Sequence, residues 1–274
     1  MNYHLFIEKM KNNNILPLLL VFGLSAQVGC QQKNDTNNPA KNIEIQNLSE
    51  GQKLKGTLTF AKPQTNYKDY LVGKTNFAKD SAFVLVPSKY CNKQTYLRKE
   101  TYEAFLKMHQ AAQKAGFNLL IVSGARNFQH QKNIWERKWK ANANLTPKER
   151  AKKILLFSSM PMSSRHHWGT DVDLNALNNA YFESGKGKKL YEWLQTNAAK
   201  YGFCQVFTDK RLKGRTGYEM EKWHWSYMPI AKQLLQDYNA QISVKDFKGF
   251  LGSETADALQ IIERYVNGIN ACME

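Results

Sequence analysis

Two histidines and two aspartates lie within eight residues in the segment SSRHHWGTDVDLNAL, which spans residues 163–177. Asp171 and Asp173 alternate with apolar residues, so on a strand both carboxylates would share one face while the apolar side chains enter the core. His166 precedes a Gly-Thr turn that would fold its ring back towards these carboxylates. An imidazole and a carboxylate supply two of the three protein ligands of an open zinc site, which predicts a metal centre here.

A candidate for the third ligand lies in the segment EKWHWSYMP, where His224 stands between two tryptophans. Alternation along a strand would place His224 on the face opposite both indoles. Glu221 lies three residues earlier and would face away from His224 on a straight strand, so the chain must bend if both serve one site. A carboxylate beside a metal-activated water is the general base of metal-assisted hydrolysis.

In this order, these residues resemble the VanY-type D-alanyl-D-alanine carboxypeptidases, zinc peptidases that share a fold with lysostaphin-type enzymes and the hedgehog signalling domain. The family pattern is Ser-x-His, two residues, Gly-x-Ala-x-Asp, and later Glu-x-x-His. It is matched here by Ser164, His166, Gly169, Asp171, Asp173, Glu221 and His224. An upstream block with Arg and a Gln five residues later is matched by Arg126 and Gln131 in SGARNFQHQ.

The resemblance implies a role for each matched position. His166, Asp173 and His224 would hold Zn²⁺, and Glu221 would be the catalytic base. Arg126 would stabilise charge on the scissile carbonyl or anchor the peptide. The expected substrate-binding residues are Gln131, Ser164 and Asp171. Asp171 replaces a small residue of the family, so it either partners a metal ligand or alters the pocket.

The function that follows is a zinc-dependent carboxypeptidase that removes a terminal D-alanine from peptidoglycan stem peptides. D,D and L,D specificity both stay open, and the alternative is a non-catalytic zinc-containing module that binds cell wall or protein. The net charge of +16 favours an anionic partner. The basic residues are scattered and form no nucleic-acid motif, so we expect no nucleic-acid partner. We also expect a monomer.

Irregularly interleaved helices and strands predict an α+β fold, in which a small antiparallel sheet carries the zinc site and packs against helices. Helical spacing and capping signals favour helices over residues 101–115, after Asn127, after Thr146, over 188–201 and over 253–266. Strands are expected within residues 117–126 and in EKWHWSY.

The N-terminus predicts export. Lys9 and Lys11 precede an apolar stretch that ends in AQVGC, which resembles the signal peptide and lipobox of a bacterial lipoprotein, with Cys30 lipidated and facing the periplasm or cell surface. We expect a signal peptide over 1–29, a disordered tether over 30–53, the zinc peptidase domain over 54–240 and a C-terminal helical extension over 241–274. Export permits disulfides, and Cys91 with Cys204 is one candidate pair.

Overall fold

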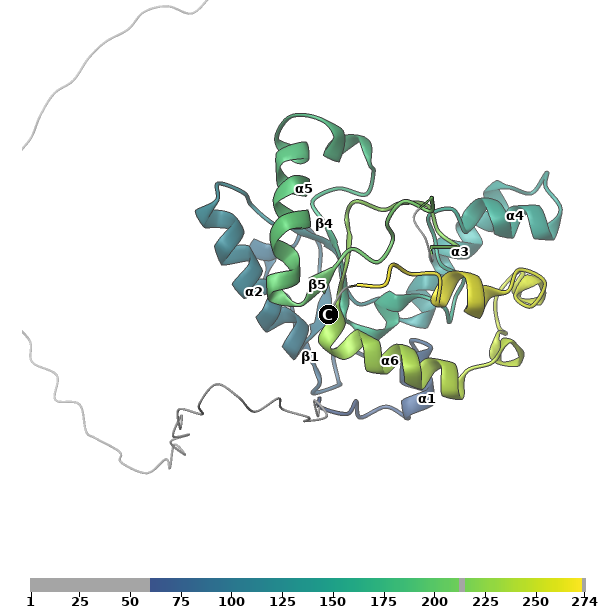
Figure 1. Cartoon of the computed structure of the whole chain (residues 1–274). Helices are drawn as coiled ribbons and strands as arrows, with labels where there is room; N and C mark the ends of the chain where they lie inside the picture. Colours follow the sequence, from purple (N-terminus) through teal and green to yellow (C-terminus); the bar gives the residue numbers. More distant parts are fainter. Residues whose placement is uncertain (1–59, 212–214, 273–274) are drawn as a thin grey trace, which may run out of the picture. The chain divides into compact units, whose positions relative to one another are not determined.

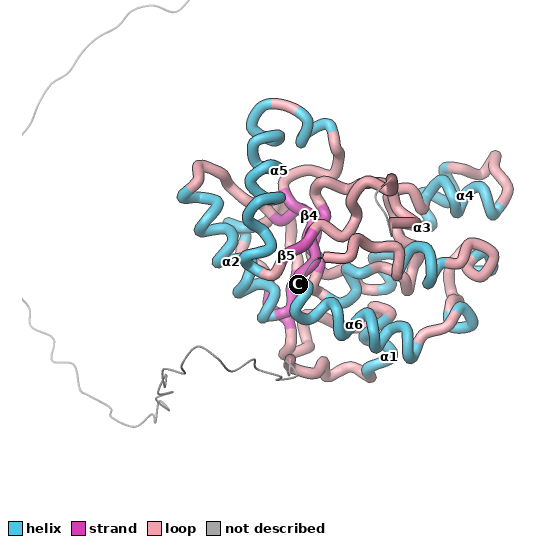
Figure 2. Tube along the Cα trace, viewed as in Figure 1, coloured by secondary structure: helices cyan, strands magenta, loops and turns pink. Residues whose placement is uncertain are grey.

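A four-stranded antiparallel sheet in the order β3-β4-β6-β5 lies at the centre of the protein. The computed structural model describes residues 60–211 and 215–272. These residues belong to one compact unit. The expected signal peptide, Cys30 and the tether lie outside the described residues. A separate hairpin pairs β1 with β2. The expected α+β class, with helices around small antiparallel sheets, is confirmed (Figure 1, Figure 2).

The bounds of the elements are as follows. The strands are β1 (Phe83–Leu85), β2 (Tyr96–Arg98), β3 (Ile121–Ser123), β4 (Asp171–Leu174), β5 (Phe203–Cys204) and β6 (His224–Tyr227). The α-helices are α1 (Tyr67–Leu71), α2 (Lys99–Lys114), α3 (Phe128–Ala141), α4 (Pro147–Ile154), α5 (Gly185–Asn197) and α6 (Met228–Gln241). Short 3-10 helices cover Ser88–Tyr90, Arg165–Trp168, Ala180–Glu183, Ala198–Tyr201, Val244–Asp246 and Ser253–Thr255.

Helices α2 and α5 flank the central strands on one side, and α3, α4 and α6 lie on the other (Figure 1). The apolar residues of the sheet, Val172, Leu174 and Trp225, pack into one core with α2 and α5. A second core joins α1, α3, α4, α6 and the C-terminal segment. The opposite face of β4 and β6 is therefore left for polar side chains, because alternate residues of a strand point to opposite faces.

Capping chemistry fixes two helices near the site. The Asn127 side chain accepts a hydrogen bond from the His130 amide at 2.8 Å and starts α3. Thr146 and Glu149 form the expected capping box at the start of α4. These signals are local in sequence, which is why both helix starts were predictable.

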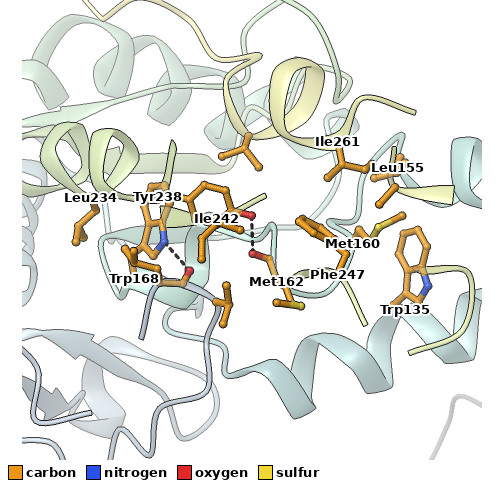
Figure 3. Close-up of a cluster of buried hydrophobic side chains, with 14 of the residues drawn as sticks. Trp135, Leu155, Met160, Met162, Trp168, Leu234, Tyr238, Ile242, Phe247 and Ile261 are labelled. Atoms are coloured by element: carbon orange, nitrogen blue, oxygen red, sulfur yellow. Dashed lines mark hydrogen bonds between the residues drawn. The ribbon is translucent and has the colours of Figure 1, made fainter. Parts of the chain in front are cut away.

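The second core anchors the turn that carries His166. Trp168 ends this turn, and its indole nitrogen donates to the Leu71 carbonyl at 3.1 Å. The Tyr238 hydroxyl of α6 donates to the carbonyl of Met162 at 3.0 Å (Figure 3). Residues on both sides of the turn are thus held by buried hydrogen bonds inside an apolar cluster.

One expectation about the C-terminal part is wrong. Residues 253–266 do not form one helix: a 3-10 helix covers Ser253–Thr255, Gln260 adopts a left-handed conformation with φ 51°, and a π-helical turn follows over Ile261–Val266. Apolar residues of the predicted C-terminal extension, including Phe247 and Ile261, join the second core (Figure 3).

The proposed cysteine pair is also wrong. Cys204 of β5 is bonded to Cys272, and Cys91 is a buried free cysteine. The bond ties the C-terminal segment to the edge strand of the sheet. In the part of the chain that the structure describes, no helix is both long and apolar enough to cross a membrane.

Candidate metal centre and active site

Strands β4 and β6 place acidic and imidazole side chains on one face of the sheet. Asp173 is the register partner of His224, and Asp171 is the partner of Ser226. Asp173 Oδ1 lies 2.9 Å from His224 Nδ1. The expectation that both aspartates share a face, while Val172 and Leu174 enter the core, is confirmed by their burial in the core with α2 and α5.

His166 reaches the same point from the 3-10 helix Arg165–Trp168. Gly169 ends this helix with φ 71°, and a Cβ there would lie 2.4 Å from the Phe83 ring, so the turn requires glycine. His166 Nδ1 lies 2.8 Å from the Gly124 carbonyl, which fixes Nδ1 as the protonated nitrogen. Its Nε2 therefore carries a lone pair and lies 3.3 Å from Asp173 Oδ1.

The donor set fits a divalent cation. His166, Asp173 and His224 each offer one ligand atom, and these atoms all lie within 4.8 Å of one another. Tetrahedral zinc with bonds of about 2 Å separates its ligand atoms by roughly 3.3 Å. The buried Nε2 of His166 has no hydrogen-bond partner within the described residues, as expected of an atom reserved for an ion. One carboxylate and two imidazoles also form a ligand type common to zinc sites.

The pKa values at this point show how charge is balanced in the metal-free protein. Burial alone would raise the pKa of Asp173, but His166 and His224 lower it below its usual range. Burial alone would lower the pKa of His224, but hydrogen bonds with Asp171 and Asp173 raise it to about 9. In the metal-free protein a proton on His224 thus lies between the two carboxylates, in addition to the charge of Arg165 beside Asp171, and a metal ion would replace that proton.

Glu221 lies beside this set because the chain bends before β6, as the sequence required. The Glu221 amide donates to the Phe207 carbonyl at 2.9 Å, and its own carbonyl accepts from Gln205 Nε2 at 3.1 Å. Its carboxylate lies 3.8 Å from His224 Nδ1. Burial, and to a lesser degree the charge of Asp173, raises the pKa of Glu221 to about 8. This value applies to the metal-free fold; a divalent cation beside Glu221 would lower the pKa and leave the carboxylate ionised, as a proton acceptor must be.

Arg126 follows β3 and is held through its backbone. Its amide donates to the His166 carbonyl at 3.0 Å, and its carbonyl accepts from His167 Nδ1 at 2.6 Å. Burial lowers the pKa of the Arg126 guanidinium, while Asp173 and Glu221 act in the opposite direction. The guanidinium thus remains charged beside the two acidic side chains.

His167, which the motif leaves as a structural residue, links Arg126 to the turn before α3. Burial lowers the pKa of His167 to about 3, so its ring is neutral and donates through Nδ1. The ring packs against Gly73, where a Cβ would lie 2.2 Å from Nδ1. Gly73 has φ 81°, and its carbonyl accepts from the Phe128 amide, so it also supports the start of α3.

Two adjoining cavities open beside these groups. The outer cavity measures about 780 Å³, and the inner one, next to His166 and His224, about 20 Å³. Arg126, Phe157, Ser158 and Glu221 line both. The outer cavity carries four cationic side chains and two acidic ones, Asp173 and Glu221, and also His130, whose pKa is lowered by burial. The cationic residues are Lys93, Arg126, Arg137 and Lys138.

None of the three expected substrate-binding residues lines either cavity in the described structure. Gln131 is fully buried, and its amide nitrogen donates to the Ser159 carbonyl at 2.7 Å. Ser164 is 1% exposed and stands two residues before His166 in the sequence. Asp171 is fully buried, and its carboxylate accepts hydrogen bonds only from protein groups. All three side chains are buried outside the cavity linings: Gln131 lies on α3, Ser164 directly before the 3-10 helix Arg165–Trp168, and Asp171 on β4.

The polar wall of the inner cavity comes from residues that the sequence reasoning missed. They are Ser158, Ser159, Ser163, Arg165 and Tyr218. Four of them fall in the short segment SSMPMSSR directly before His166, and this density of hydroxyl groups next to a candidate ligand was the available signal. Tyr218 stands in a loop without a motif, so nothing local indicated its place.

Comparison with known proteins gives a consistent result. The sequence model of the VanY family, described as D-alanyl-D-alanine carboxypeptidase, matches residues 94–230. YodJ of Bacillus subtilis, to which a carboxypeptidase activity is ascribed, is 29% identical over 219 residues, 75% of this chain and 76% of that protein. A D-alanyl-D-alanine carboxypeptidase of Enterococcus faecalis is 27% identical over 126 residues, 45% of each chain.

Solved structures with partial similarity were also found. The LdcB LD-carboxypeptidase is 27% identical with a TM-score of 0.46, covering 58% of this chain and 74% of its own. VanYB in complex with D-alanine-D-alanine is 20% identical with a TM-score of 0.42, covering 56% of this chain and 82% of its own.

Proposed function

The chain belongs to the VanY family of D-alanyl-D-alanine carboxypeptidases, and on this premise we propose that it is a zinc-dependent carboxypeptidase that removes a terminal D-alanine from peptidoglycan stem peptides. The observation that carries the proposal is the convergence of His166, Asp173 and His224 within 4.8 Å, beside a buried glutamate and an arginine. Each of these five groups has a defined task in peptide hydrolysis.

His166, Asp173 and His224 would hold the ion. When bound, it supplies a water activated for attack at neutral pH and an electrophile for the scissile carbonyl. Glu221 takes the proton of the attacking water and returns it to the leaving amine. Arg126 offers a fixed positive charge where negative charge develops on the carbonyl oxygen. The buried position of both side chains strengthens these interactions, because the local dielectric is low.

The charge of the cleft favours an anionic peptide. Lys93 and Arg137 stand on the rim of the outer cavity with exposed side chains, and no ion-pair partner for either is found among the described residues. A carboxypeptidase must recognise a free terminal carboxylate, and stem peptides carry further carboxylates. A cleft lined mainly by one sign of charge raises the local concentration of such a ligand.

The size of the inner cavity favours a small leaving residue. A volume of about 20 Å³ holds about one water-sized group, which suits a methyl side chain better than a larger one. Ser158, Ser159 and Ser163 supply hydroxyl groups on its wall, and Arg165 adds a guanidinium. This wall is suited to a small, polar product such as D-alanine.

The proposal also includes the site of action. Cleavage before Cys30 and lipidation of this residue would anchor the enzyme to a membrane, with the catalytic unit facing the periplasm or the cell surface as a monomer. Mass analysis of the mature protein from membranes tests this: an N-terminal diacylglyceryl cysteine is expected, and an unmodified Cys30 would contradict it.

The catalytic proposal is tested with purified muropeptides. Defined pentapeptide and tetrapeptide forms are incubated with the protein, with and without a chelator, and the products are analysed by mass. Loss of one alanine that stops on chelation is expected, and the form that is trimmed assigns D,D or L,D specificity. Unchanged masses under all metal conditions, together with binding of peptidoglycan by the wild type and by Glu221→Ala, would favour the non-catalytic binding module instead.

A further inference from the structure

Asp171 occupies a position that the proposed mechanism does not use. Its carboxylate is fully buried, yet it receives four hydrogen bonds. Oδ2 accepts from Arg165 Nε at 3.0 Å and lies 2.9 Å from His224 Nε2. Oδ1 accepts from the hydroxyl groups of Thr170 and Ser226, both at 2.8 Å. Because all four hydrogen bonds come from protein groups, this carboxylate has no free lone pair directed at a substrate. Any influence of Asp171 on the site must therefore act through one of these hydrogen-bond partners.

We propose that Asp171 is a positioning residue, which fixes the His224 ring with Nδ1 towards Asp173 and His166 and thereby raises the affinity of the site for a divalent cation. This inference rests on the proposed function, because it concerns the same three ligands. The two ring nitrogens of His224 face different carboxylates: Nδ1 lies 2.9 Å from Asp173 Oδ1, and Nε2 lies 2.9 Å from Asp171 Oδ2. Metal binding needs a lone pair on Nδ1, which leaves the remaining proton on Nε2 as donor to Asp171.

Packing alone does not select this orientation. The broad face of the His224 ring lies against Phe207, with ring centroids 4.6 Å apart and planes inclined by 34°. An imidazole rotated by half a turn about its Cβ–Cγ bond presents nearly the same shape to this aromatic ring, but it would exchange the positions of nitrogen and carbon. The hydrogen bond with Asp171 distinguishes the two states, because only one of them directs Nε2–H at the carboxylate.

Arg165 forms a buried ion pair with this carboxylate. Its Nη2 donates to Ser226 Oγ at 2.7 Å while its Nε donates to Asp171, so one guanidinium braces β4 and β6 together. The guanidinium also stacks over the Trp168 ring at 4.9 Å. The aspartate at a position that is small in the family pattern is thus accompanied by its own cation.

The inference is tested by zinc affinity, measured on metal-free protein by competition with a chromophoric chelator. Asp171→Asn should bind zinc about 10- to 100-fold more weakly than the wild type, the usual effect of removing a partner that orients a metal-binding histidine. The matched control is Asp80→Asn, which alters another buried aspartate that accepts backbone hydrogen bonds outside both cavities. A folded Asp171→Asn that binds zinc within twofold of the wild type would overturn the inference.

Removal of the Asp171 charge leaves Arg165 without its buried counter-ion, which can unfold the protein. The double variant Arg165→Gln with Asp171→Asn removes both charges and should show the same loss of affinity. A measurement on the wild type needs no variant: long-range ¹H–¹⁵N spectra of the zinc-loaded protein should show His224 bound through Nδ1 with a proton on Nε2. Zinc on Nε2 would overturn the inference while leaving the proposed function intact, and a wild type that binds no zinc would overturn both.

Discussion

Asp173 and His224 are direct register partners on adjacent antiparallel strands, and their side chains meet at 2.9 Å. This pair joins two motifs that are separated by 51 residues in the chain. A cross-strand pair on one face of a sheet is a rigid support, since both backbones are fixed by ladder hydrogen bonds. The third ligand atom, Nε2 of His166, needs only a short turn to reach the same oxygen.

Replacement of Glu221 by Gln should abolish turnover and leave the metal site intact. Glu221 is 6% exposed and lines both cavities, but it contributes no ligand atom to the set formed by His166, Asp173 and His224. Loss of a general base lowers kcat by about 100- to 10,000-fold. Turnover of a defined muropeptide and zinc content are measured on the same preparation. The variant should lose its activity but still contain one zinc ion per protein.

The stability of the metal-free protein should depend on pH through Glu221. Because burial raises the pKa of Glu221 to about 8 in the metal-free fold, the folded state holds a proton that the unfolded chain loses near pH 4.5. The metal-free wild type should therefore lose stability relative to Glu221→Gln as the pH rises from about 4.5 to 8. Urea unfolding of both proteins at pH 5 and pH 8 checks this. The change in the free energy of unfolding from pH 5 to pH 8 should be less favourable for the wild type than for Glu221→Gln, and an equal or more favourable change would contradict the prediction.

Arg126→Lys should lower kcat/KM by about 100-fold or more, although it keeps the charge. Lysine cannot reproduce the planar fork that places donors at a developing oxyanion. Zinc affinity should change little, because Arg126 supplies no ligand atom. The control is Arg211→Lys, which alters an exposed arginine paired with Asp209 outside both cavities. Equal kcat/KM values for the two variants would exclude a special role of the Arg126 guanidinium.

The pKa of His130 reports the positive electrostatic potential of the outer cavity. Burial lowers the pKa of His130, and the charges of Arg126 and Lys93 lower it further. Lys93→Ala should therefore raise this pKa, which an NMR titration of the His130 ring reports directly. The shift should diminish at high salt, because exposed charges are screened. Lys107→Ala, on α2 and away from this cleft, serves as control and should leave the titration unchanged.

The disulfide should contribute strongly to stability. Cys204 and Cys272 are separated by 68 residues, and closing a loop of this length in the unfolded chain corresponds to about 4 kcal/mol on the chain-entropy model. Cys272→Ser should lower the free energy of unfolding by about this amount. A thiol reductant should lower the free energy of unfolding of the wild type to that of the variant and leave the variant unaffected. A reductant effect of equal size on both proteins would show that the disulfide does not account for the difference in stability.

The parts of the fold that follow from short-range rules were predictable. Alternation placed Asp173 and Val172 on opposite faces, and capping residues such as Asn127 marked the helix starts. The three ligands could be grouped because the motif order indicated which distant segments meet. Glycine at position 169 also fits its place, since the turn needs a positive φ.

The parts that depend on long-range packing were not predictable. The periodicity of residues 253–266 is helical, but the segment packs into the second core with a left-handed residue at Gln260, so tertiary contacts override propensity there. Cys204 and Cys272 meet only because the C-terminal segment returns to β5. Gln131 and Ser164 match the motif and stay predicted substrate-binding residues, but the motif does not give the burial of their side chains, which depends on how α3 and the His166 turn pack.

The most direct test of the account is the position of the metal itself. Crystals of the zinc-loaded protein, measured on both sides of the zinc absorption edge, should give one anomalous peak within bonding distance of His166 Nε2, the Asp173 carboxylate and His224 Nδ1. The peak should vanish in Asp173→Asn. A zinc-loaded protein without a peak at this point, or with the ion bound by other residues, would contradict the account.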